Sequence, residues 1–121
     1  MRLPRSCSIT RRDDFARVKN TGQAKAGRFL ILSTLADESL TSLRTGFITT
    51  KRSGKAHDRN LLRRRFRALV RSHAPGFAEI RRYLVTIARP GASQATFAEL
   101  EADWVRQARR LGLFSRPPEA P

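Results

Sequence analysis

The sequence predicts one α/β (α+β) domain with elements in the order αβββαβα and a sheet that is at least partly antiparallel. The chain has 121 residues, of which 40% are hydrophobic, which is enough for one modest core and too little for two. Its apolar residues follow two periods, dense or alternating runs that are typical of strands and three-to-four spacing that is typical of helices. We therefore expect one domain over residues 1–114 and a disordered tail over 115–121.

The first half of the chain predicts a helix followed by strands. A helix over 11–20 would begin after Thr10, with Asp13 placing negative charge in its first turn. Residues 24–35 contain the run FLIL and predict strand, with Gly27 marking a bend or turn within it. Residues 43–50 alternate in a strand pattern after a polar turn, so we expect a hairpin and a partly antiparallel sheet.

The second half predicts helix, strand and helix. A helix over 59–73 would be capped by Asp58 and end before Pro75. Residues 83–88 (YLVTIA) predict a short apolar strand, and Arg89, Pro90 and Gly91 predict a turn.

The last helix would start at a capping box of Thr96 and Glu99 and run to about residue 111. Its apolar stripe, which predicts core contacts, comprises Phe97, Leu100, Trp104, Ala108 and Leu111. Glu99 and Asp103 share the opposite face, where we expect solvent.

The composition points to a polyanionic partner. Lys and Arg number 25 against 10 acids, giving a net charge of +15 and a pI near 11.8. Nucleic acid is the favoured partner, because clustered cations gain free energy by neutralising phosphates. A membrane partner is disfavoured: the longest apolar run, near 29–35, is far below the roughly 20 residues of a spanning helix. The basic N-terminus lacks the apolar segment of a signal peptide, so we expect a cytoplasmic protein.

The basic charge concentrates in residues 51–71, KRSGKAHDRNLLRRRFRALVR, which hold nine Lys or Arg and one acid. Helical periodicity puts Leu62, Phe66, Leu69 and Val70 on one buried stripe. The adjoining arc carries Asn60, Arg63, Arg64, Arg67 and Arg71. A solvated helix face normally mixes charge signs, so like charges without local compensation favour a bound polyanion over a merely solvated surface.

The stretch GKAHDRNLLRRRFRALVR resembles the signature helix of bacterial ribonuclease P proteins, a G-x-A-x-x-R-N-R-x-[KR]-R-x-x-R pattern. The matching residues are Gly54, Ala56, Arg59, Asn60, Arg63, Arg64 and Arg67. Leu61 departs from the pattern, which has Arg there. The resemblance covers about residues 3–114, through segments such as LPRSCSITRRDDFARVKNTG and LRTGFITTKR. It implies a two-layer α/β sandwich similar to domain 2 of ribosomal protein S5, with a left-handed β-α-β crossover.

The resemblance also implies two binding sites. Residues expected at the catalytic RNA are Lys55, Arg59, Asn60, Arg63, Arg64, Arg67 and Arg71. Residues expected at the 5′ leader of precursor tRNA are Phe15, Lys19, Phe29, Lys51, Arg52 and Arg89. Lys19 stands where many relatives have a second aromatic residue. Phe15 and Phe29 have an open alternative as ordinary core residues, because helices and strands bury Phe in any case.

The chain shows no catalytic or metal-binding pattern. Its acids form no promising cluster, and Cys7 is a single cysteine without neighbouring ligands.

The resemblance implies an accessory subunit of ribonuclease P, with ribonuclease P RNA and precursor tRNA as partners and with Mg²⁺ and the hydrolysis belonging to the RNA. We expect no cofactor on the protein alone, no membrane and no obligate protein partner. The alternative is a structural RNA-binding protein of the ribosomal or assembly type; a DNA-binding protein is disfavoured because no helix-turn-helix precedes the Arg-rich helix.

Overall fold

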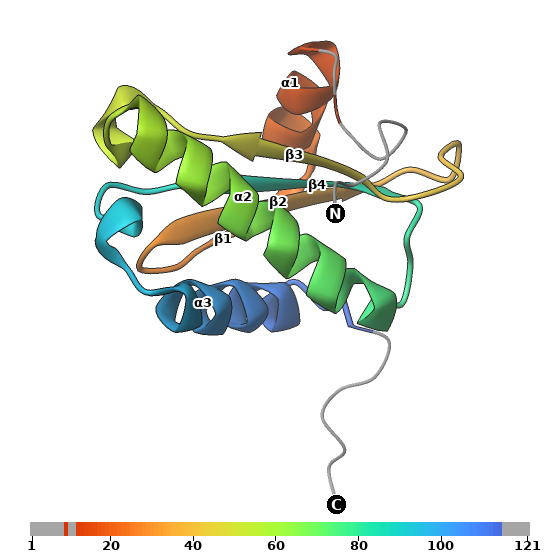
Figure 1. The fold of residues 1–121 in the computed structure, drawn as a ribbon. Helices are drawn as coiled ribbons and strands as arrows, with labels where there is room; N and C mark the ends of the chain where they lie inside the picture. The colour runs from red at the N-terminus through yellow and green to blue at the C-terminus, as the bar shows by residue number, and fades with distance from the viewer. Residues whose placement is uncertain (1–8, 10–11, 115–121) are drawn as a thin grey trace, which may run out of the picture.

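The computed structural model describes Ile9 and residues 12–114, and it confirms the order αβββαβα (Figure 1). The elements are α1 (Arg12–Thr21), β1 (Gln23–Ala26), β2 (Leu30–Ala36), β3 (Arg44–Ile48), α2 (Ala56–His73), β4 (Arg82–Ala88) and α3 (Phe97–Arg110). Short 3₁₀ turns cover Lys51–Ser53, Ala74–Gly76 and Ala92–Gln94. The expected Thr10 cap and the expected tail over 115–121 lie outside the described residues.

The four strands form one mixed sheet in the order β1-β2-β4-β3. β2 pairs antiparallel with β1 and with β4, so the sheet is partly antiparallel as expected. β3 pairs parallel with β4, with Ile48 opposite Ile87. Since α2 joins these two parallel neighbours, β3-α2-β4 is the crossover unit that the family resemblance implies.

The predicted hairpin between 24–35 and 43–50 is wrong, because β4 lies between β2 and β3. The hairpin of this fold lies instead within 24–35, where the Gly27 N–H donates to the Leu30 carbonyl at 2.7 Å and the chain reverses. The physical reason for the order is burial. β2 and β4 are the strands with most buried residues and take the centre, whereas β1 is mostly exposed and lies at an edge.

The main core lies between the sheet and the helices α2 and α3. Leu32 of β2 and Leu84 of β4 pack there with Phe66 of α2, and all three are fully buried. Trp104 of α3 is also fully buried, as its stripe predicts, and its indole N–H donates to the Thr86 hydroxyl at 3.2 Å. Sheet and two helices thus form the expected two layers.

α1 lies on the opposite face of the sheet, where it builds a smaller cluster (Figure 1). Val18 is its buried residue and packs with Val85 and Tyr83 of β4. Strand alternation explains the two clusters, because successive side chains of β4 point to opposite faces. One sheet therefore carries two distinct surfaces, one on each side.

α2 begins three residues earlier than its periodicity predicts. Gly54 has φ of +130°, a conformation that favours glycine, and Lys55 is the residue that caps the helix. The expected cap, Asp58, lies one turn inside instead, where its carboxylate accepts the Lys55 backbone N–H at 3.0 Å. The capping role is therefore shared between a backbone turn and an acid at the third helical position.

α3 begins at the predicted capping box. The Thr96 hydroxyl accepts the Glu99 N–H at 3.1 Å, and the Glu99 carboxylate accepts the Thr96 N–H at 2.8 Å. This second hydrogen bond lowers the pKa of Glu99.

Asp103, by contrast, is not simply solvated as expected. Its carboxylate is half-buried and accepts the Phe29 backbone N–H at 2.8 Å and the Gln107 amide at 3.0 Å. Helical periodicity places a residue on a face of its own helix, but it does not show which strand or turn comes to lie against that face.

Candidate nucleic-acid interface

The outer side of α2 carries the predicted cationic arc. The predicted apolar stripe is confirmed: Leu62, Phe66, Leu69 and Val70 are all buried against the sheet and α3. Beside it, Asn60, Arg64 and Arg71 are exposed and Arg59, Arg63 and Arg67 are half-buried. One packed helix therefore displays these groups along one side.

Several of these side chains are held in place by the protein. The Arg63 guanidinium donates to the Asn60 amide oxygen at 2.8 Å, and the Arg67 guanidinium lies 5.8 Å from the centre of the Phe47 ring. The Arg59 Nε is buried and has no hydrogen-bond partner within the described part of the chain. A side chain that is already ordered loses less entropy when it binds a phosphate, so this arrangement suits anion binding.

Leu61, the departure from the signature pattern, lies on the surface with 38% of its area exposed. Its neighbour Arg65 does not take over the role of the missing Arg, because its guanidinium donates to the Ala95 carbonyl at 3.0 Å and ties α2 to the segment before α3. Leu61 is thus an apolar residue within a cationic surface.

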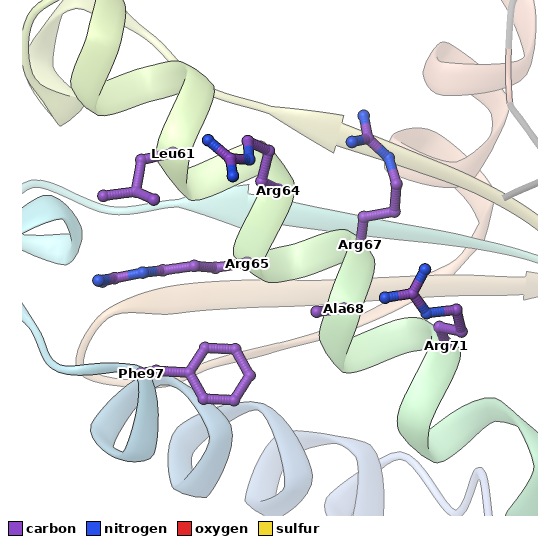
Figure 2. A pocket seen from close by; sticks show the side chains of 7 residues that line it. All are labelled: Leu61, Arg64, Arg65, Arg67, Ala68, Arg71 and Phe97. Atoms are coloured by element: carbon purple, nitrogen blue, oxygen red, sulfur yellow. The ribbon is translucent and has the colours of Figure 1, made fainter. Parts of the chain in front are cut away.

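A pocket of about 520 Å³ opens between α2 and the start of α3 (Figure 2). Its lining consists of Leu61, Arg64, Arg65, Arg67, Ala68, Arg71 and Phe97. Phe97 was expected in the core, but it is 38% exposed, because it is the first residue of α3 and lies at the end of the apolar stripe. The sequence pattern did not predict that Phe97 lies on the surface. Its position directly after the Thr96 cap, at the very start of the helix, is the signal that could have indicated this.

A second hollow of about 530 Å³ lies on the other face of the sheet, under α1. Its lining consists of Arg12, Phe15, Ala16, Val18, Lys19, Ala24, Ile31, Ser33, Ile48, Val85 and Ile87. We call it the α1 groove. Two of the expected leader-binding residues, Phe15 and Lys19, come together here, with an apolar floor from the sheet and cations at α1.

Phe15 is both a groove residue and a packing residue. Its ring lies so close to β3 that a Cβ at Gly46 would be 2.6 Å from it, and it packs against the smaller cluster. It stays half-buried, so part of it is open to the groove. The two alternatives for Phe15 are therefore compatible.

Phe29 is not brought together with Phe15. It precedes β2 and packs against the main core on the α3 side of the sheet. There it lines a separate pocket with Arg28, whose guanidinium lies 5.0 Å from the Phe29 ring centre.

The remaining expected leader contacts are exposed cations at one end of the sheet. Lys51 and Arg52 follow β3, and Arg89 follows β4 and donates to the Gly27 carbonyl at 2.7 Å. Because β3 and β4 run parallel, these residues leave the sheet at the same end as Ile48 and Ile87, which line the α1 groove. These three cations therefore lie beyond that end of the α1 groove, where an extended chain bound in the groove would pass them.

Within Ile9 and residues 12–114, no group of three or more His, Cys, Asp or Glu is arranged to hold a metal ion. His57 pairs with Asp58 at 3.1 Å, and His73 pairs with Glu101 at 2.9 Å. No helix in these ranges is long and apolar enough to cross a membrane.

Fold and surfaces together define a basic α+β protein with an Arg-rich helix on one side of its sheet and a groove on the other. The sequence model of the family described as Ribonuclease P matches residues 3–112. The ribonuclease P protein component of Syntrophomonas wolfei is 32% identical over 94% of both chains, and that of Chloroflexus aggregans is 36% identical over 98% of this chain and 87% of its own. The Staphylococcus aureus RNase P protein has the same fold, with a TM-score of 0.82 over 89% of this chain and 97% of its own at 22% identity.

The chain therefore belongs to the ribonuclease P protein family. Membership makes it a protein component of an endoribonuclease complex and implies an RNA partner.

Proposed function

We propose that the chain is the accessory subunit of ribonuclease P that binds the catalytic RNA through α2 and the 5′ leader of precursor tRNA through the α1 groove. The observation that carries the proposal is that the Arg-rich side of α2 and the α1 groove lie on opposite faces of one sheet. In this proposal Mg²⁺ and the hydrolysis belong to the RNA subunit, and the protein acts in the cytoplasm, where bacterial precursor tRNA is made.

The α2 surface fits an RNA backbone by charge. The one acid of residues 51–71, Asp58, accepts the Lys55 N–H and pairs with His57, so it does not neutralise the arginines further along the helix. Guanidinium groups can bind phosphate oxygens through two parallel hydrogen bonds, which gives both affinity and orientation. A folded RNA with closely spaced phosphates meets these requirements.

The α1 groove fits a single strand by shape and chemistry. Its floor is apolar, from residues such as Ile31, Val85 and Ile87, while Arg12 and Lys19 stand on α1 beside it. Unpaired bases stack on aromatic and apolar surfaces, and their phosphates are neutralised by neighbouring cations. The half-exposed Phe15 provides such an aromatic surface.

The protein's contribution is then binding and positioning. Neutralising phosphates adds affinity for the substrate, and holding the leader extended positions the substrate for a reaction whose chemistry is carried elsewhere. If about six leader phosphates were neutralised, log affinity would fall with log salt at a slope of roughly −4.

Reconstitution tests the proposal. The purified chain is added to bacterial ribonuclease P RNA and precursor tRNA at low Mg²⁺, and cleavage at the mature 5′ end is measured. We expect the chain to stimulate cleavage, with the effect weakening steeply as salt rises. RNA binding without stimulation would instead identify a structural RNA-binding protein.

A further inference from the structure

The pocket between α2 and α3 combines exposed apolar side chains with arginines. Within the described ranges, three large hydrophobic residues are exposed, namely Leu61, Ile80 and Phe97. Two of the three line this one pocket, although they are 36 positions apart in the chain. Exposed apolar residues that converge on a concave site indicate a binding function more strongly than scattered ones do.

The two apolar side chains line the pocket on either side of Arg65 (Figure 2). Figure 2 shows Leu61 projecting from α2 and Phe97 projecting from the start of α3, with the Phe97 ring pointing toward Ala68. Arg65 extends between them and is held by the Ala95 carbonyl at 3.0 Å, so it braces the two helices. The volume of about 520 Å³ falls within the range of about 300 to 1,000 Å³ that is typical of ligand pockets.

The charge at the rim of the pocket indicates what kind of molecule binds there. Arg64, Arg67 and Arg71 belong to the lining, and none of the lining residues is acidic. A purely apolar partner would make no use of the cationic rim, and a bare phosphate would make no use of the Phe97 ring. A nucleotide satisfies both requirements, since its base is planar and apolar on its faces and its phosphate is anionic.

We infer that the α2–α3 pocket holds one unpaired nucleotide of the RNA partner, with its base against Phe97 and Leu61 and its phosphate at the arginine rim, Arg64 foremost. This inference rests on the proposed function, because it takes ribonuclease P RNA as the partner of α2. It also gives a physical account of Leu61. A leucine in place of the pattern's Arg exchanges a phosphate contact for apolar surface in the pocket that Phe97 also lines, so the chain gains a contact to a base where it loses one to the backbone.

Affinity for ribonuclease P RNA, measured over a range of salt concentrations, tests the inference. Phe97→Ala should weaken binding about 5-fold or more at every salt concentration without changing the salt slope, because a stacked base is lost and no ion pair is. Arg64→Gln should instead make the slope shallower by about 0.7 to 0.9. Ile80→Ala removes the third exposed hydrophobic, which lies outside the pocket, and should bind as the unmodified protein does.

A fluorescent variant distinguishes binding of a base in the pocket from binding of anionic charge alone. Phe97→Trp adds an indole to the pocket, and the signal of the buried Trp104 is subtracted by using the unmodified protein. A single-stranded oligoribonucleotide should quench the added indole, whereas polyphosphate, an equally anionic chain without bases, should not. Equal quenching by both probes, or Phe97→Ala binding that matches the unmodified protein, would overturn the inference while the reconstitution assay still succeeds. Failure of the unmodified chain to stimulate cleavage would overturn the proposed function itself.

Discussion

At the scale of single residues, Asp103 joins α3 to the turn between β1 and β2. Its carboxylate accepts the Phe29 N–H at 2.8 Å, and a Cβ at Gly27 would lie within 2.0 Å of it, so the turn packs directly on this side chain. Asp103→Ala should lower the free energy of unfolding by about 1 to 3 kcal/mol, because a half-buried N–H loses a charged acceptor. Urea denaturation measures this change.

The control for Asp103 is Glu38→Ala, which removes an exposed carboxylate from the loop between β2 and β3. It should change the stability by less than about 0.5 kcal/mol. An equally small effect of Asp103→Ala would show that water replaces the carboxylate at the Phe29 N–H.

Phe15 tests the α1 groove at the same scale. Because its half-exposed ring lines the groove, Phe15→Ala should weaken binding of precursor tRNA with a leader by about 5-fold or more and leave binding of leaderless tRNA unchanged. Competition binding to the reconstituted complex measures both. An equal loss for the two substrates would assign Phe15 to packing alone.

At the scale of elements, Gly54 fixes where α2 begins. Its φ of +130° disfavours any residue with a Cβ, and a Cβ there would also lie 2.8 Å from Asp58 Cβ. Gly54→Ala should therefore destabilise the protein by about 1 to 3 kcal/mol and loosen the first turn of α2. Thermal unfolding measures the loss, with Gly76→Ala as the matched control, because a Cβ at Gly76 would meet Phe114 only at an ordinary 3.4 Å.

The capping box of α3 predicts a pH dependence. The Thr96 N–H holds the pKa of Glu99 below its ordinary value of 4.5, so the charged carboxylate stabilises the folded state. A lowered pKa gives stability that is fully present above the ordinary value and is lost as the pH falls through the folded-state pKa. The unmodified protein should therefore exceed Glu99→Ala in melting temperature above about pH 5, and the difference should shrink below pH 4.5. A constant difference across this range would assign the effect of the mutation to packing.

The sequence predicts the elements of this fold better than their pairing. Periodicity identifies the stripe of Leu62 and Phe66, because it depends only on the geometry of one helix. The pairing of β2 with β4 joins residues about fifty positions apart, such as Leu32 and Thr86, and depends on which strands bury most surface. Local pattern does not contain that comparison, which is why the expected hairpin with β3 is absent.

The same limit of local sequence pattern decides which parts of the candidate site could be predicted. The Arg arc of α2 follows from helical spacing, and Phe15 and Lys19 share the α1 groove because they lie one turn apart on α1. Phe97 and Leu61, in contrast, line one pocket only because α3 packs beside α2, and Phe29 turns to the core side at the end of a strand where alternation stops holding. Both outcomes are set by tertiary packing.

At the scale of the whole molecule, the sheet separates the two surfaces that we propose bind RNA. The arginines of α2 stand on the side of the main core, and the α1 groove lies on the side of the smaller cluster. The main core between them contains the fully buried residues Leu32, Leu84 and Phe66, and close-packed interiors deform little. Under the proposed function such a body would hold two RNAs at a fixed spacing, so we expect binding at one surface to leave the other unchanged.

Independence of the two surfaces predicts additive mutational effects. Arg64 of α2 and Phe15 of the α1 groove line separate pockets on opposite faces of the sheet. The losses in kcat/KM are measured in the reconstituted complex, at RNA concentrations near the assembly midpoint, and converted to free energies as RT ln of the ratio to the unmodified protein. The loss of the double variant, Arg64→Gln with Phe15→Ala, should equal the sum of the two single losses to within about 0.5 kcal/mol. Leaderless substrate isolates the α2 contribution, because only Arg64→Gln should then matter. A coupling clearly above about 0.5 kcal/mol would contradict this independence. It would mean that the catalytic RNA reaches around the sheet edge to the groove, or that α1 shifts when α2 is bound. In either case, binding at one surface would change binding at the other.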